Sequence, residues 1–128
     1  ARYHSDADFC VLTGDLTEHG DTASYELLKG MLTMLPLKTF LIPGNCDDRE
    51  AFSSIFREQK AEGYLQSSFQ NDEKLFVFLH TLGDGVSPAG RYDEPRQAWL
   101  RRTLEAHPGT QVYMFMHHPP MDIGHSND

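Results

Sequence analysis

The stretch TFLIPGNCDDR, residues 39–49, indicates a strand, a sharp turn and the start of a helix in direct succession. Its apolar first half predicts a buried strand, and Pro43-Gly44 breaks that strand and forces the turn. The turn directs Asn45 off the end of the sheet, where its amide oxygen can bind a hard cation. Asp47, Asp48 and Arg49 can orient this loop through charge-assisted hydrogen bonds, and Asp47 or Asp48 can also cap the helix that follows.

On both sides of this stretch, apolar strands alternate with amphipathic helices. Strands are predicted at residues 8–13, 38–42, 63–69, 74–81 and 111–116. Helices are predicted at residues 22–35, 49–59 and 96–106. We expect the first helix to bury Leu27, Leu28, Met31, Leu32 and Leu35, and Trp99 to lie in the core. The alternation indicates an α/β fold with a layered sheet, and the two adjacent middle strands make that sheet mixed.

Length and composition exclude several classes of protein. The 128 residues fit one domain. A net charge of -8 argues against a nucleic-acid binder, which normally carries a basic stripe. No apolar run approaches the roughly 20 residues of a membrane helix, and the first residues lack the apolar segment of a signal peptide, so a cytoplasmic location is expected. Two cysteines are too few for a disulfide framework.

Polar side chains follow two further strands at the point where each strand ends. Asp15 follows the first strand, and His117-His118 follow the last. Taken singly, Asp15 could cap a turn and the two histidines could lie on the surface. Ligands of open α/β sheets, however, bind outside the carboxyl ends of the strands. We therefore expect Asp15, Asn45 and His117 to gather at one rim of the sheet, where they would form a metal site.

These segments, in this order and spacing, resemble the calcineurin-like metallophosphoesterases. The matching blocks are Gly14-Asp15, Gly44-Asn45-Cys46-Asp47 and His117. Residues 44–49, 97–100 and 115–120 look more specifically like the bacterial cyclic-nucleotide and glycerophosphodiester phosphodiesterases. The resemblance implies a four-layer α/β/β/α fold and hydrolysis of phosphodiesters by a hydroxide held between two divalent cations. Iron, manganese, zinc and cobalt all suit such ligands.

The resemblance also implies a role for each matching residue. Asp15 would bridge the two metals, Asn45 would bind the second metal and the phosphate, and His117 would complete the shell of that metal. Cys46 stands where the family usually has a histidine that stabilises the phosphate and is often proposed to protonate the leaving oxygen. The resulting catalytic residues are Cys46, Asp47 and His118, of which His118 would hold the loop or touch phosphate. Substrate contacts are expected from Asn45, Asp122 and His125.

Two blocks of the family pattern, the leading Asp-x-His and the closing Gly-His-x-His, are not found. Residues 1–128 are therefore expected to form a single, truncated metallophosphoesterase domain with an incomplete fold. Such a fragment alone would bind one cation at most and would be weakly active or inactive. Open sheet edges would favour self-association into a homo-oligomer.

Two alternatives remain. The chain could be a non-catalytic phosphoesterase-fold scaffold or binding module, in which Cys46 marks a degenerate metal site. It could also be a phosphoacceptor domain with Asp15 at a strand end, but that interpretation gives no role to Asn45 and His117. His80 is expected to be a core or strand-end histidine rather than a ligand.

Overall fold

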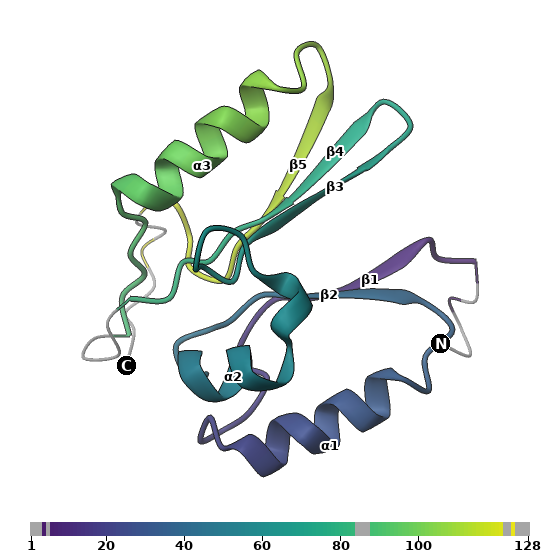
Figure 1. Cartoon of the computed structure of the whole chain (residues 1–128), viewed down its shortest axis with the longest axis vertical. Coiled ribbons are helices and arrows are strands. Elements are labelled where there is room, and N and C mark those ends of the chain that lie inside the picture. Colours follow the sequence, from purple (N-terminus) through teal and green to yellow (C-terminus); the bar gives the residue numbers. More distant parts are fainter. Residues whose placement is uncertain (1–3, 5, 84–87, 122–123, 125–128) are drawn as a thin grey trace.

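The computed structural model describes residues 4, 6–83, 88–121 and 124 of the chain. Within these residues the strands form two sheets (Figure 1). In the first sheet, β1 (Phe9–Leu12) pairs in parallel with β2 (Lys38–Leu41). In the second sheet, β4 (Lys74–Phe78) pairs antiparallel with β3 (Ser67–Asn71) and parallel with β5 (Gln111–Phe115). The predicted mixed sheet is therefore the second of two.

Helices cover the outer face of each sheet (Figure 1). The helices α1 (Thr22–Leu32) and α2 (Arg49–Ile55) lie against β1 and β2, followed by the short 3-10 helix η1 (Arg57–Gln59). The helix α3 (Glu94–Glu105) lies against the sheet of β3, β4 and β5. The result is the α/β/β/α order of layers that the family resemblance implies.

Alternation of side chains along the strands builds a core in each gap between layers. In β2, Leu41 faces the helices, whereas Phe40 faces the second sheet. In β4, Leu75 and Val77 face α3, whereas Phe78 faces β1 and β2. The rings of Phe40 and Phe78 stack across the gap with centroids 4.2 Å apart. This aromatic layer holds the two sheets together, and Trp99 lies in the core under α3, as predicted.

Helix α1 differs from its prediction in length and in the face that it buries. It ends at Leu32, three residues before the predicted end, in a turn that continues to Leu35. The side chains of Leu27 and Met31 are 68% and 59% exposed. The buried residue is Tyr25, and Leu28 and Leu32 share its face at the spacing of a helix. The prediction was therefore right for Leu28 and Leu32 and wrong for Leu27 and Met31, because it counted only aliphatic residues and left out the tyrosine.

Other boundaries moved for local reasons. The predicted helix 49–59 breaks at Phe56, whose φ of -107° and ψ of 60° are not helical. Asp48, rather than Asp47, caps α2, with its side chain accepting a hydrogen bond from Ala51 N at 2.8 Å. In the β3–β4 hairpin Asn71 pairs with Lys74, so the turn consists of residues 72 and 73. The strand β3 starts at Ser67, four residues after the predicted start at residue 63. No helix in the described ranges is long and apolar enough to cross a membrane.

Candidate metal centre

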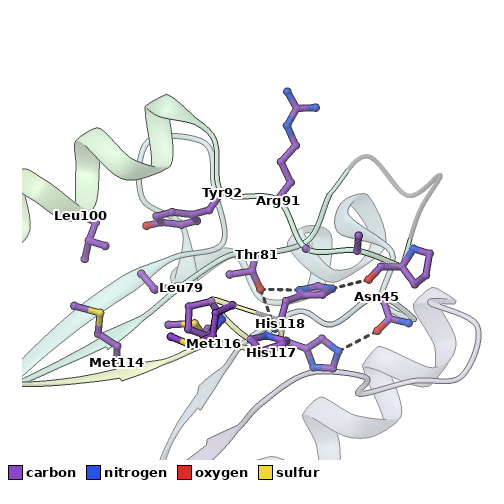
Figure 2. Close-up of a pocket in the computed structure, with 16 residues that line it drawn as sticks. Asn45, Leu79, Thr81, Arg91, Tyr92, Leu100, Met114, Met116, His117 and His118 are labelled. Atoms are coloured by element: carbon purple, nitrogen blue, oxygen red, sulfur yellow. Dashed lines mark hydrogen bonds between the residues drawn. The ribbon is translucent and has the colours of Figure 1, made fainter. Parts of the chain in front are cut away.

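The strands β1, β2 and β5 end at the same edge of the molecule (Figure 1). An open cavity of about 1080 Å³ lies beside these strand ends (Figure 2). Asn45, His117 and His118 line one side of this cavity. The rest of its wall is largely apolar, with contributions from Leu79, Tyr92, Leu100, Met114 and Met116. The loops that carry the predicted ligands therefore border a space large enough for a small organic molecule.

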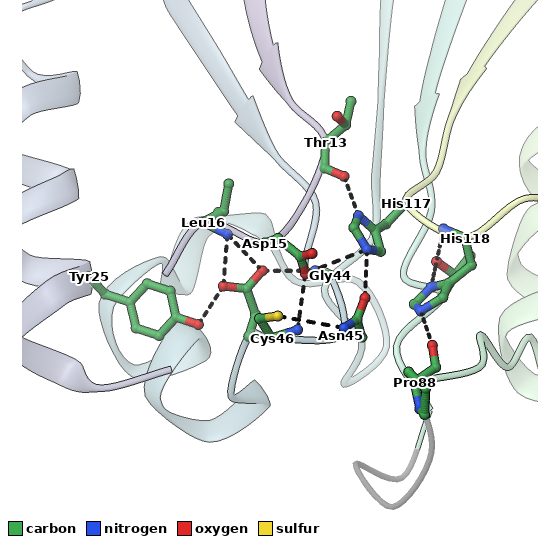
Figure 3. A network of polar contacts seen from close by, with 12 residues as sticks. Thr13, Asp15, Leu16, Tyr25, Gly44, Asn45, Cys46, Pro88, His117 and His118 are labelled. Carbon is green, nitrogen blue, oxygen red and sulfur yellow. Dashed lines mark hydrogen bonds and ion pairs between the residues drawn. The ribbon is translucent and has the colours of Figure 1, made fainter. Parts of the chain in front are cut away.

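Asp15, Asn45 and His117 meet at this edge, as the sequence predicts (Figure 3). His117 Nε2 lies 3.0 Å from Asn45 Oδ1 and 3.5 Å from Asp15 Oδ1. The other ring nitrogen, His117 Nδ1, lies 2.8 Å from the carbonyl oxygen of Thr13. We refer to Asp15, Asn45 and His117 as the trio.

The protonation of His117 decides what the trio can hold. A carbonyl oxygen only accepts hydrogen bonds, so Nδ1 carries a proton and donates it to Thr13. In the neutral ring, the lone pair of Nε2 then faces two oxygen acceptors. A cation among the three atoms would satisfy this arrangement. Imidazole, carboxylate and amide donors together fit a divalent transition metal.

Two glycines allow the trio to approach so closely. Gly14 has a φ of 107°, and a Cβ at this position would collide with the ring of His117. A Cβ on Gly44 would collide with Asp15 and would lie 2.8 Å from His117 Cε1. Asp15 itself has a φ of 53°, a conformation that is uncommon outside glycine and that clusters at functional sites. The sharp turns therefore serve the contact between the side chains.

Asp47 lies beneath the trio, not in it. Its carboxylate is 5% exposed and accepts hydrogen bonds from Leu16 N at 3.2 Å, Gly44 N at 2.8 Å and the hydroxyl of Tyr25 at 2.8 Å. Leu16 follows Asp15, and Gly44 precedes Asn45. Asp47 therefore ties together the two loops that carry the trio's oxygen ligands. This position matches the loop-orienting alternative of the sequence analysis.

Cys46 lies on the exposed side of the same loop. Its backbone N–H donates to Asp15 Oδ1 at 3.0 Å, and its Sγ lies 3.6 Å from Asn45 Nδ2. The negative charge of Asp15 raises the pKa of the Cys46 thiol, so the sulfur keeps its proton next to the trio.

His118 turns away from the trio and joins the second sheet to the loop that precedes α3. Its Nδ1 lies 2.8 Å from Thr81 Oγ1, and its Nε2 lies 3.1 Å from the carbonyl oxygen of Pro88. The backbone N–H of His118 donates to the same Thr81 hydroxyl at 3.3 Å. Burial lowers the pKa of His118, which favours the neutral ring, in which Nε2 donates to the carbonyl oxygen of Pro88 and Nδ1 accepts from the Thr81 hydroxyl.

The remaining predicted residues lie elsewhere. Asp122 and His125 lie outside the described residues. Arg49, considered as a support for the Asn45 loop, instead donates to the carbonyl oxygen of Gly63 at 2.8 Å. His80 is buried, as expected of a core histidine. In the described part of the chain no group of three or more His, Cys, Asp or Glu side chains could hold a metal ion, so a site here depends on the amide of Asn45.

Sequence reasoning missed Tyr25 and Thr81. Tyr25 is fully buried, and a buried tyrosine hydroxyl normally needs a hydrogen-bond partner. Its position one helical turn before Leu28 was a usable signal. Thr81 gave no comparable signal, because its role follows from the fold, which brings it to His118 across 37 residues of chain.

Comparison with known proteins shows the family of the chain. The family profile described as "Calcineurin-like phosphoesterase" matches residues 2–128. The chain belongs to the calcineurin-like phosphoesterase family. The chain is 35% identical over 127 residues to a "Probable cyclic nucleotide phosphodiesterase" of Rhodopseudomonas palustris. The matched region covers 96% of this chain and 46% of the relative.

Two further curated relatives extend the comparison. A "Probable glycerophosphodiester phosphodiesterase" of Arcobacter nitrofigilis is 31% identical, over 91% of this chain and 44% of its own length. A "3',5'-cyclic adenosine monophosphate phosphodiesterase" of Vibrio vulnificus is 26% identical, over 94% of this chain and 43% of its own length. The chain thus spans less than half of each of these curated relatives.

Proposed function

We propose that this chain carries part of the active site of a metal-dependent phosphodiesterase, with the trio as ligands of a divalent cation. The observation that carries the proposal is the convergence of His117 Nε2 on Asn45 Oδ1 and Asp15 Oδ1. The mixed donor set suits iron, manganese, zinc or cobalt, and the family pattern implies two such ions in the whole protein. Bound cations would supply Lewis-acid polarisation of the phosphate and a water of lowered pKa.

The chain's own residues divide the work of binding and orientation. Asp15 brings the negative charge that a bridging position between two cations requires. Asn45 would offer its amide oxygen to a cation. Its Nδ2, which lies 3.6 Å from Cys46 Sγ in this structure, would then donate to a phosphate oxygen. His117 keeps its Nε2 lone pair directed at the site because its Nδ1 donates a hydrogen bond to the carbonyl oxygen of Thr13.

The other predicted residues support the site to different degrees. Cys46 lies on the exposed side of the Asn45 loop, and its thiol would be the donor of a proton to the leaving oxygen. Asp47 and His118 act as positioning residues, since their polar atoms are engaged with the protein. Contacts of Asp122 and His125 with the substrate stay predictions.

The substrate class is a small phosphodiester, of the cyclic-nucleotide or glycerophosphodiester kind. The names of the relatives support this choice, and the cavity beside the trio offers room for an organic group of such an ester. Weak activity of residues 1–128 alone, self-association through sheet edges and a cytoplasmic location stay predictions. The alternative, a scaffold with a degenerate metal site, is favoured by Cys46 at the position of the usual histidine.

Hydrolysis of bis(p-nitrophenyl) phosphate by the full-length protein with Mn²⁺ tests the proposal. Asn45→Ala removes one ligand, and we expect it to lower kcat/KM about 100-fold, the upper range for disturbed metal sites. Asn71→Ala, an exposed asparagine at the tip of the β3–β4 hairpin, is the matched control and should keep the wild-type rate. Equal rates for all three proteins would contradict the proposal. Protein without stoichiometric metal after supplementation would favour the scaffold.

A further inference from the structure

The hydroxyl of Tyr25 on α1 touches the carboxylate that ties the two oxygen-ligand loops together (Figure 3). We propose that Tyr25 is a positioning residue of the metal centre, which acts through Asp47 to set the placement of Asp15 relative to Asn45. The inference rests on the proposed function, since it assigns a role toward the same site.

The Asp47 carboxylate connects the two loops that carry Asp15 and Asn45. Its Oδ1 accepts from the Tyr25 hydroxyl at 2.8 Å, its Oδ2 accepts from Gly44 N at 2.8 Å, and both oxygens lie 3.2 Å from Leu16 N. Each loop is thus held at the residue next to its ligand. A shift of the Asp47 carboxylate would move Leu16 and Gly44 together and would change the distance between Asp15 and Asn45.

Tyr25 fixes the position of the Asp47 carboxylate. Its hydroxyl donates to Asp47 and also accepts from Asp48 N at 3.1 Å, so it contacts two consecutive residues of the Asn45 loop. Burial raises the pKa of Tyr25 well above its ordinary value, which keeps the hydroxyl protonated as a donor. Asp48 in turn caps α2. The one hydroxyl therefore connects α1, the start of α2 and the metal loops.

The ring of Tyr25 is held by the core and not by the loops. It is fully buried and makes edge-to-face contacts with Phe52 and Phe56, at centroid distances of 5.6 and 6.3 Å. A hydroxyl on a ring fixed in this way is a rigid reference point for the more exposed loops. Ligands keep a productive geometry when their supporting residues are themselves locked by packing. Without the hydroxyl, Asp47 loses one donor and Asp48 N loses its acceptor.

The test is Tyr25→Phe in the full-length protein, because this change removes the hydroxyl and keeps the ring. Tyr113→Phe, at a partly exposed tyrosine of β5, is the matched control. Co²⁺ titration, followed by absorption at a temperature where every protein is folded, should show about tenfold weaker binding for Tyr25→Phe and an altered spectrum. Amide hydrogen exchange in the metal-free protein should be faster at Leu16 and Gly44. The control should match the wild type in both measurements.

The outcomes separate this inference from the proposed function. Wild-type Co²⁺ affinity and spectrum in Tyr25→Phe, even with a lower unfolding temperature, would overturn the positioning role and leave the metal centre intact. A wild-type protein that binds no Co²⁺ would overturn the proposed function itself. Asp47→Asn, alone and combined with Tyr25→Phe, adds a further test. If Tyr25 acts through Asp47, the double variant should lose less Co²⁺-binding free energy than the sum of the losses in the two single variants. Additive losses would contradict the proposal.

Discussion

The two sheets support the candidate metal centre in different ways. On the side of β1 and β2, Asp15 and Asn45 lie on loops that a buried carboxylate ties together through backbone hydrogen bonds. On the side of β5, His117 approaches Asp15 and Asn45 from the other sheet, and its Nδ1 donates a hydrogen bond to the carbonyl oxygen of Thr13. The oxygen ligands are therefore fixed relative to each other by local contacts. The nitrogen ligand depends on how the two sheets pack.

Gly14→Ala should have the largest effect on metal affinity and activity, because Gly14 lies where the β1 and β2 loops contact His117 of the other sheet. The new Cβ would collide with the ring of His117 at a residue whose φ of 107° already disfavours alanine. We expect Co²⁺ affinity and diester hydrolysis to fall at least about 100-fold in a protein that still folds. Co²⁺ titration and far-UV circular dichroism together measure both effects.

Gly109→Ala is the control for this change. Gly109 also has a positive φ, of 74°, but a Cβ there would meet no atom within 4 Å. It should therefore lose stability from backbone strain alone and keep its metal affinity. Equal losses of metal affinity in the two variants would show that strain, and not the contact with His117, explains the requirement for glycine.

Phe78→Ala tests whether packing between the sheets positions His117. Phe78 stacks on Phe40 across the gap, and its truncation should cost about 3–5 kcal/mol of unfolding free energy. Leu75→Ala, on the other face of the same strand, should cost about 2–5 kcal/mol but should disturb only the packing under α3. Urea unfolding measures both losses. We expect Co²⁺ affinity to fall more in Phe78→Ala, and the reverse order would contradict the comparison.

The prediction with the smallest expected effect on the metal centre concerns the pH dependence of stability. Burial, followed by the charges of Arg96 and Arg49, lowers the pKa of His80 from 6.5 to about 3. The unfolded chain therefore binds a proton at His80 that the folded protein excludes. Stability should fall as the pH drops from about 6.5 toward 3, by up to about 1.4 kcal/mol per pH unit from this group.

His80→Gln should remove this part of the pH slope, as measured by urea unfolding at several pH values. An identical slope in the wild type and in His80→Gln would show that the buried histidine does not make the second sheet sensitive to acid.

The parts that the sequence predicted well depend on local chemistry. The strand ends at Gly14-Asp15 and Pro43-Gly44-Asn45 are marked by residues that break a strand wherever they occur. Parallel strands bring their carboxyl ends to one edge, so the meeting of Asp15 and Asn45 followed from the pattern. The capping role of Asp48 was one of two alternatives, because either carboxylate could have served.

Other features could not be predicted, because they depend on which surfaces meet. The aliphatic stripe of Leu27 and Met31 satisfied helical spacing as well as the true face did, and only packing against Phe52 and Phe56 selects Tyr25. The division of the strands into two sheets was not visible, since alternating side chains look alike in both arrangements. Asp47 was grouped with catalytic residues by its motif, whereas burial directs it to the backbone.

The amino-acid sequence by itself determined the kinds of ligand and the strand ends that carry them, because turn residues and apolar runs act over a few neighbouring positions. Tertiary structure alone decided which atoms face one another. His117 Nε2 meets Asn45 Oδ1 because the aromatic side chains of two separate sheets pack together. Tyr25 reaches Asp47 because a helix docks on β1 and β2. Both contacts join residues distant in the chain, and only close packing of the core specifies them.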